Sequence, residues 1–202
     1  MSHQAEQELF LRARAGDRLA FDRLQTMLEA PIHRFVFRLI GRSESEADIV
    51  RNVLLALYMN LERIHSVESL RPFIFRIARN LCYNEMRRKG RFQTVSLDVE
   101  SGEIGTLLAA VKDRRPSPED RAQWTLLYAE IQRAIDRLPE LQRQALILYC
   151  EEDLSYAQIA EVMAADVGTV KSRIYYARKN LERLLHPETL EALNLNKENN
   201  HG

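Results

Sequence analysis

Residues 154–174 read LSYAQIAEVMAADVGTVKSRI, and this stretch decides the fold of the carboxyl-terminal part of the chain. Ser155 is placed to cap one helix, and Asp166 or Thr169 to cap the next. Ala160 is small where the two helices must approach each other closely. Apolar residues repeat at helical spacing along both helices. They predict a shared core formed by Ile159, Met163, Val167, Val170 and Ile174.

Two helices at this spacing are typical of a helix-turn-helix, whose second helix enters the DNA major groove with its first residues facing the base edges. Arg173 can bridge guanine O6 and N7, whereas Arg178 and Lys179 are better placed for phosphates. The alternative is an ordinary helical hairpin with a solvated basic face. The residues that we expect to contact DNA here are Lys171, Ser172, Arg173, Tyr175, Tyr176, Arg178 and Lys179.

The composition is typical of a helical protein. The chain has 202 residues with only 7 glycines and 6 prolines, and 46% of the residues are hydrophobic, which suffices for a packed core. Twenty-nine basic residues balance 29 acidic ones, so the distribution of charge along the chain matters more than its sum. No apolar run reaches the length of a membrane span, and the amino end is polar. We therefore expect a cytoplasmic protein.

Four amphipathic helices are expected before residue 61. Two short helices lie within residues 5–29 and meet at Gly16-Asp17. Pro31 opens a third, which runs from Ile32 to Ile40. The fourth is capped by Ser43 or Ser45 and ends near Leu61.

A second basic element follows over residues 71–91, where seven basic residues face one acid, Glu85. The buried stripe of this helix is expected at Phe73, Ile77, Leu81 and Met86. Aromatic residues interleaved with basic ones suit bases held out of a duplex, although a solvated helix face is the alternative. The candidate DNA contacts are Arg76, Arg79, Asn80, Asn84, Arg87 and Arg88.

Helical periodicity stops between the basic element at residues 71–91 and the helices of the carboxyl-terminal part, where glycine and proline interrupt an acidic stretch. We predict an all-α protein of two small helical domains joined by a flexible linker, the second a four-helix helix-turn-helix domain. The ranges are 5–92 and 120–186 for the domains, 93–119 for the linker and 187–202 for a disordered tail. Cys82 and Cys150 are expected to be buried reduced thiols, with a redox sensor or an interdomain disulfide as alternatives.

Four motifs, in order and with family spacing, resemble a bacterial RNA polymerase sigma factor of the extracytoplasmic-function type, a group of the sigma-70 family. They cover about residues 6–186 and read ARAGDRLAFDRL from Ala13, SEADIVRNVLLALYMNL from Ser45, LRPFIFRIARNLCYNEMRR from Leu70 and LPELQRQALILYCEEDLSYAQIAEVMAADVGTVKSRIYYARKNLERLL from Leu138.

The resemblance implies an initiation factor that binds core RNA polymerase at its clamp and flap and directs promoter-specific transcription. The first domain would dock on the clamp and melt the −10 element, and the second would read the −35 element. By resemblance, the loop near His65–Leu70 would capture a flipped base, with Asn80 and Asn84 helping. The implied partners are double- and single-stranded promoter DNA and an anti-sigma factor. The implied docking residues are Glu46, Asp48, Arg51 and Asn52.

Two departures from the family pattern stand out. Arg51 and Asn52 replace a glutamine and an acid on the docking helix, so core binding is expected to be weaker or conditional, for example on phosphorylation of Ser43 or Ser45. Tyr176 stands where many relatives carry a basic residue, which alters the expected −35 preference.

The sequence disfavours three other classes of protein. An enzyme is disfavoured because the five histidines are scattered and no phosphate-cradling loop or nucleophile elbow occurs, so neither a metal nor a cofactor is expected. A conventional helix-turn-helix regulator would not need the basic helix at residues 71–91. A sigma-like decoy for an anti-sigma factor would have no reason to keep both basic faces. Binding to core polymerase separates the sigma interpretation from all three.

Overall fold

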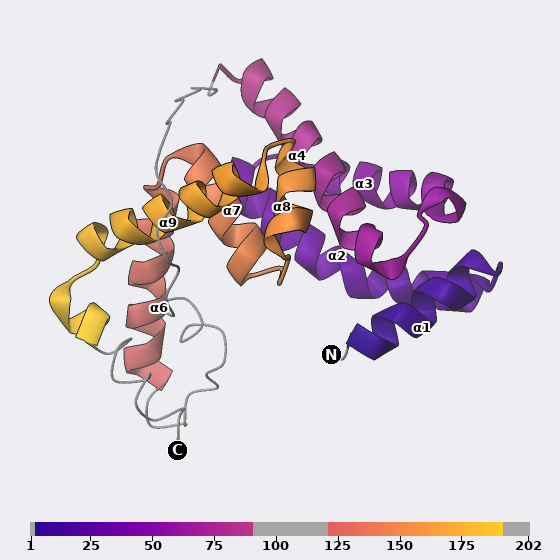
Figure 1. The fold of residues 1–202 in the computed structure, drawn as a ribbon, viewed down its shortest axis with the longest axis horizontal. Helices are drawn as coiled ribbons and strands as arrows, with labels where there is room; N and C mark the ends of the chain where they lie inside the picture. The colour runs from indigo at the N-terminus through magenta and orange to yellow at the C-terminus, as the bar shows by residue number, and fades with distance from the viewer. Residues whose placement is uncertain (1–2, 91–120, 192–202) are drawn as a thin grey trace. The chain divides into compact units, whose positions relative to one another are not determined.

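The computed structural model describes residues 3–90 and 121–191, and every regular element in these two ranges is a helix (Figure 1). The chain divides into two compact units, with a boundary after residue 94. The all-α fold predicted from the sequence is confirmed. The predicted linker over 93–119 lies outside the described residues.

The first unit consists of four α-helices and two short 3₁₀ turns. Their bounds are His3–Arg14 for α1, Arg18–Ile40 for α2, Glu46–Asn60 for α3, Leu61–Arg63 and Val67–Ser69 for the 3₁₀ turns, and Leu70–Arg88 for α4.

The turn between α1 and α2 lies where the sequence predicts it. Gly16 has φ +91°, a backbone conformation that glycine adopts without steric cost. Asp17 caps α2, because its Oδ1 accepts the Ala20 N–H at 3.0 Å, and its Oδ2 accepts Arg12 Nη2 at 2.6 Å. The Ala20 bond and the Arg12 bond together lower the pKa of the Asp17 carboxyl. The cap is therefore ionised near neutral pH.

The predicted break at Pro31 is wrong, because α2 runs through this residue to Ile40. An internal proline removes one helical hydrogen bond and crowds the preceding turn. Leu28, Ile32 and Phe35 are nevertheless fully buried on a continuous face that spans the proline. This face packs against α3 and α4, and its burial outweighs the local penalty.

The predicted buried stripe of α4 is also wrong, because Phe73, Ile77 and Leu81 are only half-buried. The buried face lies on neighbouring positions that contact α2 and α3, and Phe75 packs edge-on against Phe35 with ring centroids 5.1 Å apart. Two sides of α4 are apolar, so spacing alone did not select the one that meets the core. The buried residues are Leu70, Pro72, Ile74, Phe75, Ala78, Cys82 and Glu85.

The second unit contains four α-helices and a short helical segment after them, and Ser155 and Asp166 directly precede the third and the fourth of these helices, as predicted. The predicted helix-turn-helix core is largely confirmed, since four of its five members are buried. Val167 is the exception, with 41% of its surface exposed at the first position of the fourth helix. The bounds are Arg121–Asp136 for α6, Glu140–Cys150 for α7, Tyr156–Met163 for α8 and Val167–Leu184 for α9.

The start of the predicted disordered tail needs correction. Residues 187–191 are helical, and Thr189 is buried. The Glu130 carboxylate of α6 holds this turn, accepting the His186 N–H at 2.8 Å and the Thr189 hydroxyl at 2.7 Å. Contacts with α6 therefore hold residues 187–191, which were expected to belong to the disordered tail. Residues 192–202 lie outside the described part of the chain.

The two cysteines are separate thiols, as expected, with Cys82 buried and Cys150 half-buried. Among the described residues, none of the helices is both long and apolar enough to cross a membrane.

Candidate nucleic-acid interface

Helix α9 has one buried face and one basic face. Val170, Ile174 and Ala177 are buried against the rest of the second unit. The predicted DNA contacts of α9 lie outside this buried face, and their side chains differ in how exposed they are. Lys171 and Lys179 are exposed, whereas Ser172, Arg173, Tyr175, Tyr176 and Arg178 are half-buried.

Two of the predicted arginine contacts of α9 are held by the protein itself. Arg178 Nε donates to Glu182 Oε1 at 3.1 Å, one turn along the helix. Arg173 has its Nη1 atom buried, so part of its guanidinium is directed into the protein. Lys171 and Lys179 are thus the exposed cations among the predicted contacts of this helix.

A pair of local features fixes the start of each helix in the motif. Ser155 Oγ accepts the Gln158 N–H at 3.3 Å, and Gln158 Oε1 accepts the Ser155 N–H at 2.9 Å, which is a capping box. Asp166 occupies the cap position of α9 in an extended backbone conformation but makes no side-chain capping hydrogen bond, and Ala164 takes φ +49° in the turn between the helices. The predicted Ser155 cap is confirmed. Its partner Gln158 was missed, although the spacing S-x-x-Q identifies it.

An aromatic pair lies beside the first turn of α9 and was not predicted. The rings of Tyr149 and Tyr156 stack with centroids 5.2 Å apart and an interplanar angle of 5°. Lys171 Nζ lies 5.9 Å from the centroid of the Tyr156 ring, within the range of a cation–π contact. Burial and then a hydrogen bond with Tyr149 raise the pKa of Tyr156 to about 12. The stacked pair thus restricts where Lys171 lies.

The basic helix α4 is less uniformly basic in space than in sequence. Arg71 forms a two-pronged ion pair with Glu6 of α1, with Nη2 2.7 Å from Oε2. Arg79 lies 4.3 Å over the ring of Tyr83 and donates to its hydroxyl at 3.2 Å. Arg76, Asn80 and Asn84 are exposed, as is Arg87, which donates to Asn84 Oδ1 at 2.6 Å.

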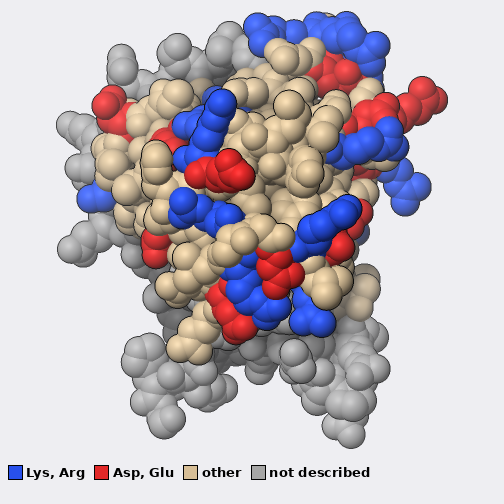
Figure 2. Space-filling model, turned by 90° about the vertical axis from the view of Figure 1, so that its right-hand side faces the viewer, with Lys and Arg blue, Asp and Glu red and all other residues tan. Residues whose placement is uncertain are grey.

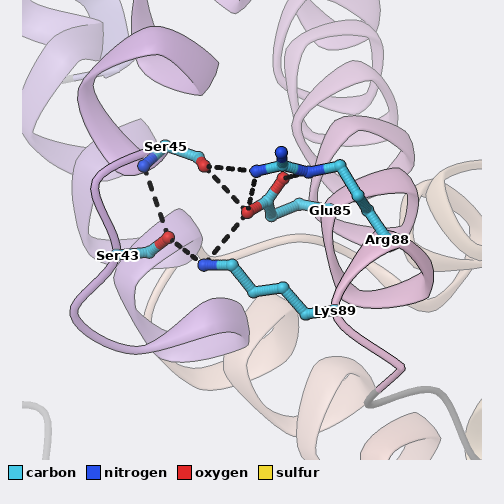
Figure 3. A network of polar contacts seen from close by, with 5 residues as sticks. All are labelled: Ser43, Ser45, Glu85, Arg88 and Lys89. Atoms are coloured by element: carbon cyan, nitrogen blue, oxygen red, sulfur yellow. Dashed lines mark hydrogen bonds and ion pairs between the residues drawn. The ribbon is translucent and has the colours of Figure 1, made fainter.

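The last turn of α4 points its charged side chains toward the start of α3 (Figure 3). Arg88, a predicted DNA contact, donates to Glu85 through Nε at 2.9 Å and through Nη2 at 3.0 Å. Ser45 and Lys89 bind the same carboxylate, at 2.8 Å and 3.0 Å. Lys89 also donates to Ser43 Oγ at 2.6 Å, so five polar side chains form one network that was not predicted from the sequence.

Helix α3 places the four predicted docking residues unequally. Asp48 and Arg51 are largely exposed and face each other at 3.3 Å, and Asn52 is also exposed. Glu46 is directed inward, with Oε1 3.0 Å from His33 Nδ1 and only 14% of its side chain accessible. The outer face of α3 also exposes large apolar side chains that the sequence reasoning did not single out: Leu55, Tyr58 and Met59.

The described residues form no metal-ligating cluster of histidine, cysteine and acidic side chains. Figure 2 shows basic and acidic side chains interspersed on one face of the molecule. This distribution agrees with the net charge of zero. DNA binding therefore depends on local groups on particular helices rather than on one broad basic field.

Comparison with known proteins identifies both parts of the chain. The family model for sigma-70 region 2 matches residues 24–92, and that for sigma-70 region 4 matches residues 128–181. The RNA polymerase sigma-H factor of Pseudomonas aeruginosa is 31% identical over 95% of this chain and 100% of its own length. This chain belongs to the extracytoplasmic-function group of the sigma-70 family. The extracytoplasmic-function sigma-E factor of Escherichia coli is 30% identical over 93% of this sigma factor and 98% of its own length.

Two solved structures share the fold of this sigma factor. RpoE of Bartonella quintana, in complex with the anti-sigma factor NepR, matches with a TM-score of 0.57 at 22% identity, covering 81% of this chain and 95% of RpoE. CnrH, in complex with the cytosolic domain of CnrY, matches with a TM-score of 0.60 at 19% identity, covering 89% of this chain and 96% of CnrH.

Proposed function

We propose that the two units of this sigma factor have separate functions. Residues 5–92 dock on core RNA polymerase and read and melt the −10 element through α4. Residues 120–186 read the −35 element through α9. Residues 93–119 link the two domains. The protein acts as a regulatory subunit of the polymerase in the cytoplasm and carries out no catalysis of its own.

The observation that carries this proposal is the presence of a partly exposed basic helix in each unit, within segments that match regions 2 and 4 of sigma-70. On α9, Lys171 and Lys179 project from the outer face. On α4, Arg76, Arg87 and two asparagines are exposed. Lysine and arginine supply phosphate contacts, and asparagine can pair with base edges. One chain can therefore bind two separate DNA elements.

Core binding is proposed to rest more on apolar contact than on charge. Glu46 is directed inward and Asp48 is paired with Arg51, so little unbalanced negative charge is left on the outer face of α3. Leu55 and Met59 are more than half exposed on this helix and supply apolar surface for a partner.

An anti-sigma factor is the proposed means of control. RpoE of Bartonella quintana, which shares the fold, was solved with the anti-sigma factor NepR. A protein that covers the apolar face of α3 would block polymerase docking without any change in the DNA-reading helices.

The deciding experiment is a pull-down with core RNA polymerase followed by run-off transcription from a promoter library. Initiation from a shared two-part element supports the proposal. Capture of an anti-sigma factor without core binding favours a decoy. Specific DNA binding by the chain alone, without polymerase, favours a conventional regulator.

The Arg51→Glu variant tests whether Arg51 lowers the affinity of α3 for core polymerase. If Arg51 opposes docking, this change raises the affinity for core polymerase, because it replaces a cation with an anion on a helix that carries several acids in the family. Glu29→Gln, an exposed change on α2, serves as the control. Unchanged core binding by Arg51→Glu would show that Arg51 does not face the polymerase.

A further inference from the structure

The most concentrated polar network of the first unit surrounds the carboxylate of Glu85 (Figure 3). Glu85 lies on α4, yet only 10% of its side chain is accessible, because it is directed at the amino end of α3. The Ser45 hydroxyl donates to Oε1 at 2.8 Å, and Lys89 Nζ lies 3.0 Å from the same atom. Lys89 also donates to Ser43 Oγ at 2.6 Å.

Arg88 is held by this carboxylate in a defined orientation. Its Nε and Nη2 donate to the two oxygens of Glu85 at 2.9 Å and 3.0 Å, which is a bidentate pair. The Arg88 side chain nevertheless remains 70% exposed. Nη1 takes no part in the network and points away from Glu85 (Figure 3). The guanidinium is thus fixed along one edge and open along the other.

The charge of the network favours a role in holding an anion. One buried carboxylate faces two cations, Arg88 and Lys89, so the group carries a net charge of about +1. Hydrogen bonds, first from Arg88 and then from Ser45 and Lys89, lower the pKa of Glu85 to about 2. The carboxylate therefore stays ionised at any pH at which the protein works, and the arrangement is permanent rather than switchable.

We propose that Glu85 is a positioning residue that orients Arg88 and Lys89 toward the backbone phosphates of promoter DNA, with Ser45 anchoring the carboxylate to the start of α3. This inference rests on the proposed function, which places α4 on the −10 region. An arginine whose Nε edge is already fixed loses less conformational freedom when its other edge binds a phosphate. Glu85 thus aids DNA binding although its own charge repels DNA.

A double-mutant cycle on the holoenzyme tests this role. Promoter affinity and its salt dependence are measured for the wild type, Glu85→Gln, Arg88→Ala and the double variant. Arg88→Ala removes one phosphate contact, so the slope of log K against log salt falls by about 0.7 to 0.9. Glu85→Gln weakens promoter binding roughly three- to tenfold in the wild-type background and has a clearly smaller effect with Arg88→Ala, where only Lys89 is left to be oriented.

Controls separate positioning from folding. Glu29→Gln makes the same change in charge on α2 outside the network and leaves promoter affinity within about twofold of the wild type. Ser45→Ala removes one bond of the network while keeping the Glu85–Arg88 pair, so it gives a smaller loss of the same non-additive kind. The melting temperature of each variant shows whether the first unit remains folded.

Three outcomes would overturn the inference. Additive losses from Glu85→Gln and Arg88→Ala would show that Glu85 acts on the fold and not through Arg88. Tighter promoter binding by Glu85→Gln would show that the carboxylate competes with DNA. An unchanged salt slope for Arg88→Ala would place Arg88 away from phosphates. In each case run-off transcription by the Glu29→Gln holoenzyme shows independently whether the sigma function itself stands.

Discussion

At the scale of single residues, carboxylates hold the points where helices begin or end. Asp17 caps α2, Glu85 ties the end of α4 to the start of α3, and Glu130 holds the turn after α9. All three have a lowered carboxyl pKa. Each accepts hydrogen bonds that only its ionised form receives fully. The folded state therefore depends on these carboxylates remaining charged.

Replacing Glu130 tests the attachment of the carboxyl-terminal turn. Burial raises the pKa of this carboxyl, but bonds from His186 and Thr189 outweigh that effect and lower it below 4.5. Glu130→Gln is expected to cost about 1–2 kcal/mol and to expose the amides of residues 187–191 to hydrogen exchange. The exposed Glu188→Gln is the control.

The same attachment has a predictable pH dependence. Because the folded pKa of Glu130 is depressed, its contribution is complete above the unfolded value of 4.5 and is lost as the pH falls through the folded value. Wild-type exchange at residues 187–191 should thus approach that of Glu130→Gln only in acid. Equal protection in both proteins at neutral pH would contradict this role.

At the scale of elements, the register of α4 decides which side of the helix is buried and which side is left for the proposed contact with DNA. Phe75 is fully buried against Phe35, whereas the neighbouring Phe73 is half-exposed. Phe75→Ala should destabilise the first unit by about 3–5 kcal/mol, because it leaves a cavity in the core. Phe73→Ala should cost less than about 2 kcal/mol. Urea unfolding followed by hydrogen exchange of α2–α4 amides compares the two, and equal costs would contradict the observed register.

The sequence predicted helix ends better than it predicted helix faces. Ends are marked by local chemistry: the Gly16-Asp17 turn and the Ser155 cap both lie where the sequence predicts them. The buried face of α4 and the continuity of α2 through Pro31 depend on what packs against them. The pair Arg88–Glu85 has the i,i+3 spacing that places two side chains side by side on a helix, so the sequence could have indicated it. The contact of Glu85 with Ser45 could not be predicted in this way, because it arises only when two distant segments fold together.

The first residues of α9 should determine the −35 preference. If Arg173 reads a base, Arg173→Ala costs about 1–3 kcal/mol on the preferred promoter and relaxes the choice at one position. Lys179→Ala is the matched comparison, because an exposed phosphate contact should lower binding equally on all sequences. A promoter library measured with both holoenzymes distinguishes them. A uniform loss with Arg173→Ala would assign Arg173 to the phosphates or to the fold.

At the scale of the whole molecule, a chain without net charge must bind DNA through separate local sites. The exposed cations of α4 and α9 belong to different units, and each unit folds around its own core. Much of the remaining arginine charge is used internally, as in the pairs Arg71–Glu6 and Arg178–Glu182. Under the proposed function, we therefore expect promoter recognition by this sigma factor to require both units on one DNA.

This division of labour predicts additive electrostatics. Arg87→Ala on α4 and Lys179→Ala on α9 should each lower the slope of log K against log salt by about 0.7 to 0.9 for holoenzyme binding to a two-element promoter. Together they should lower it by the sum, since changes at independent sites add. On a promoter fragment truncated so that no DNA extends to the −35 position, Lys179→Ala should have no effect, while Arg87→Ala keeps its own. A Lys179 effect that persists on the truncated fragment would show that α9 binds DNA elsewhere, because the phosphates it is proposed to contact would then be absent.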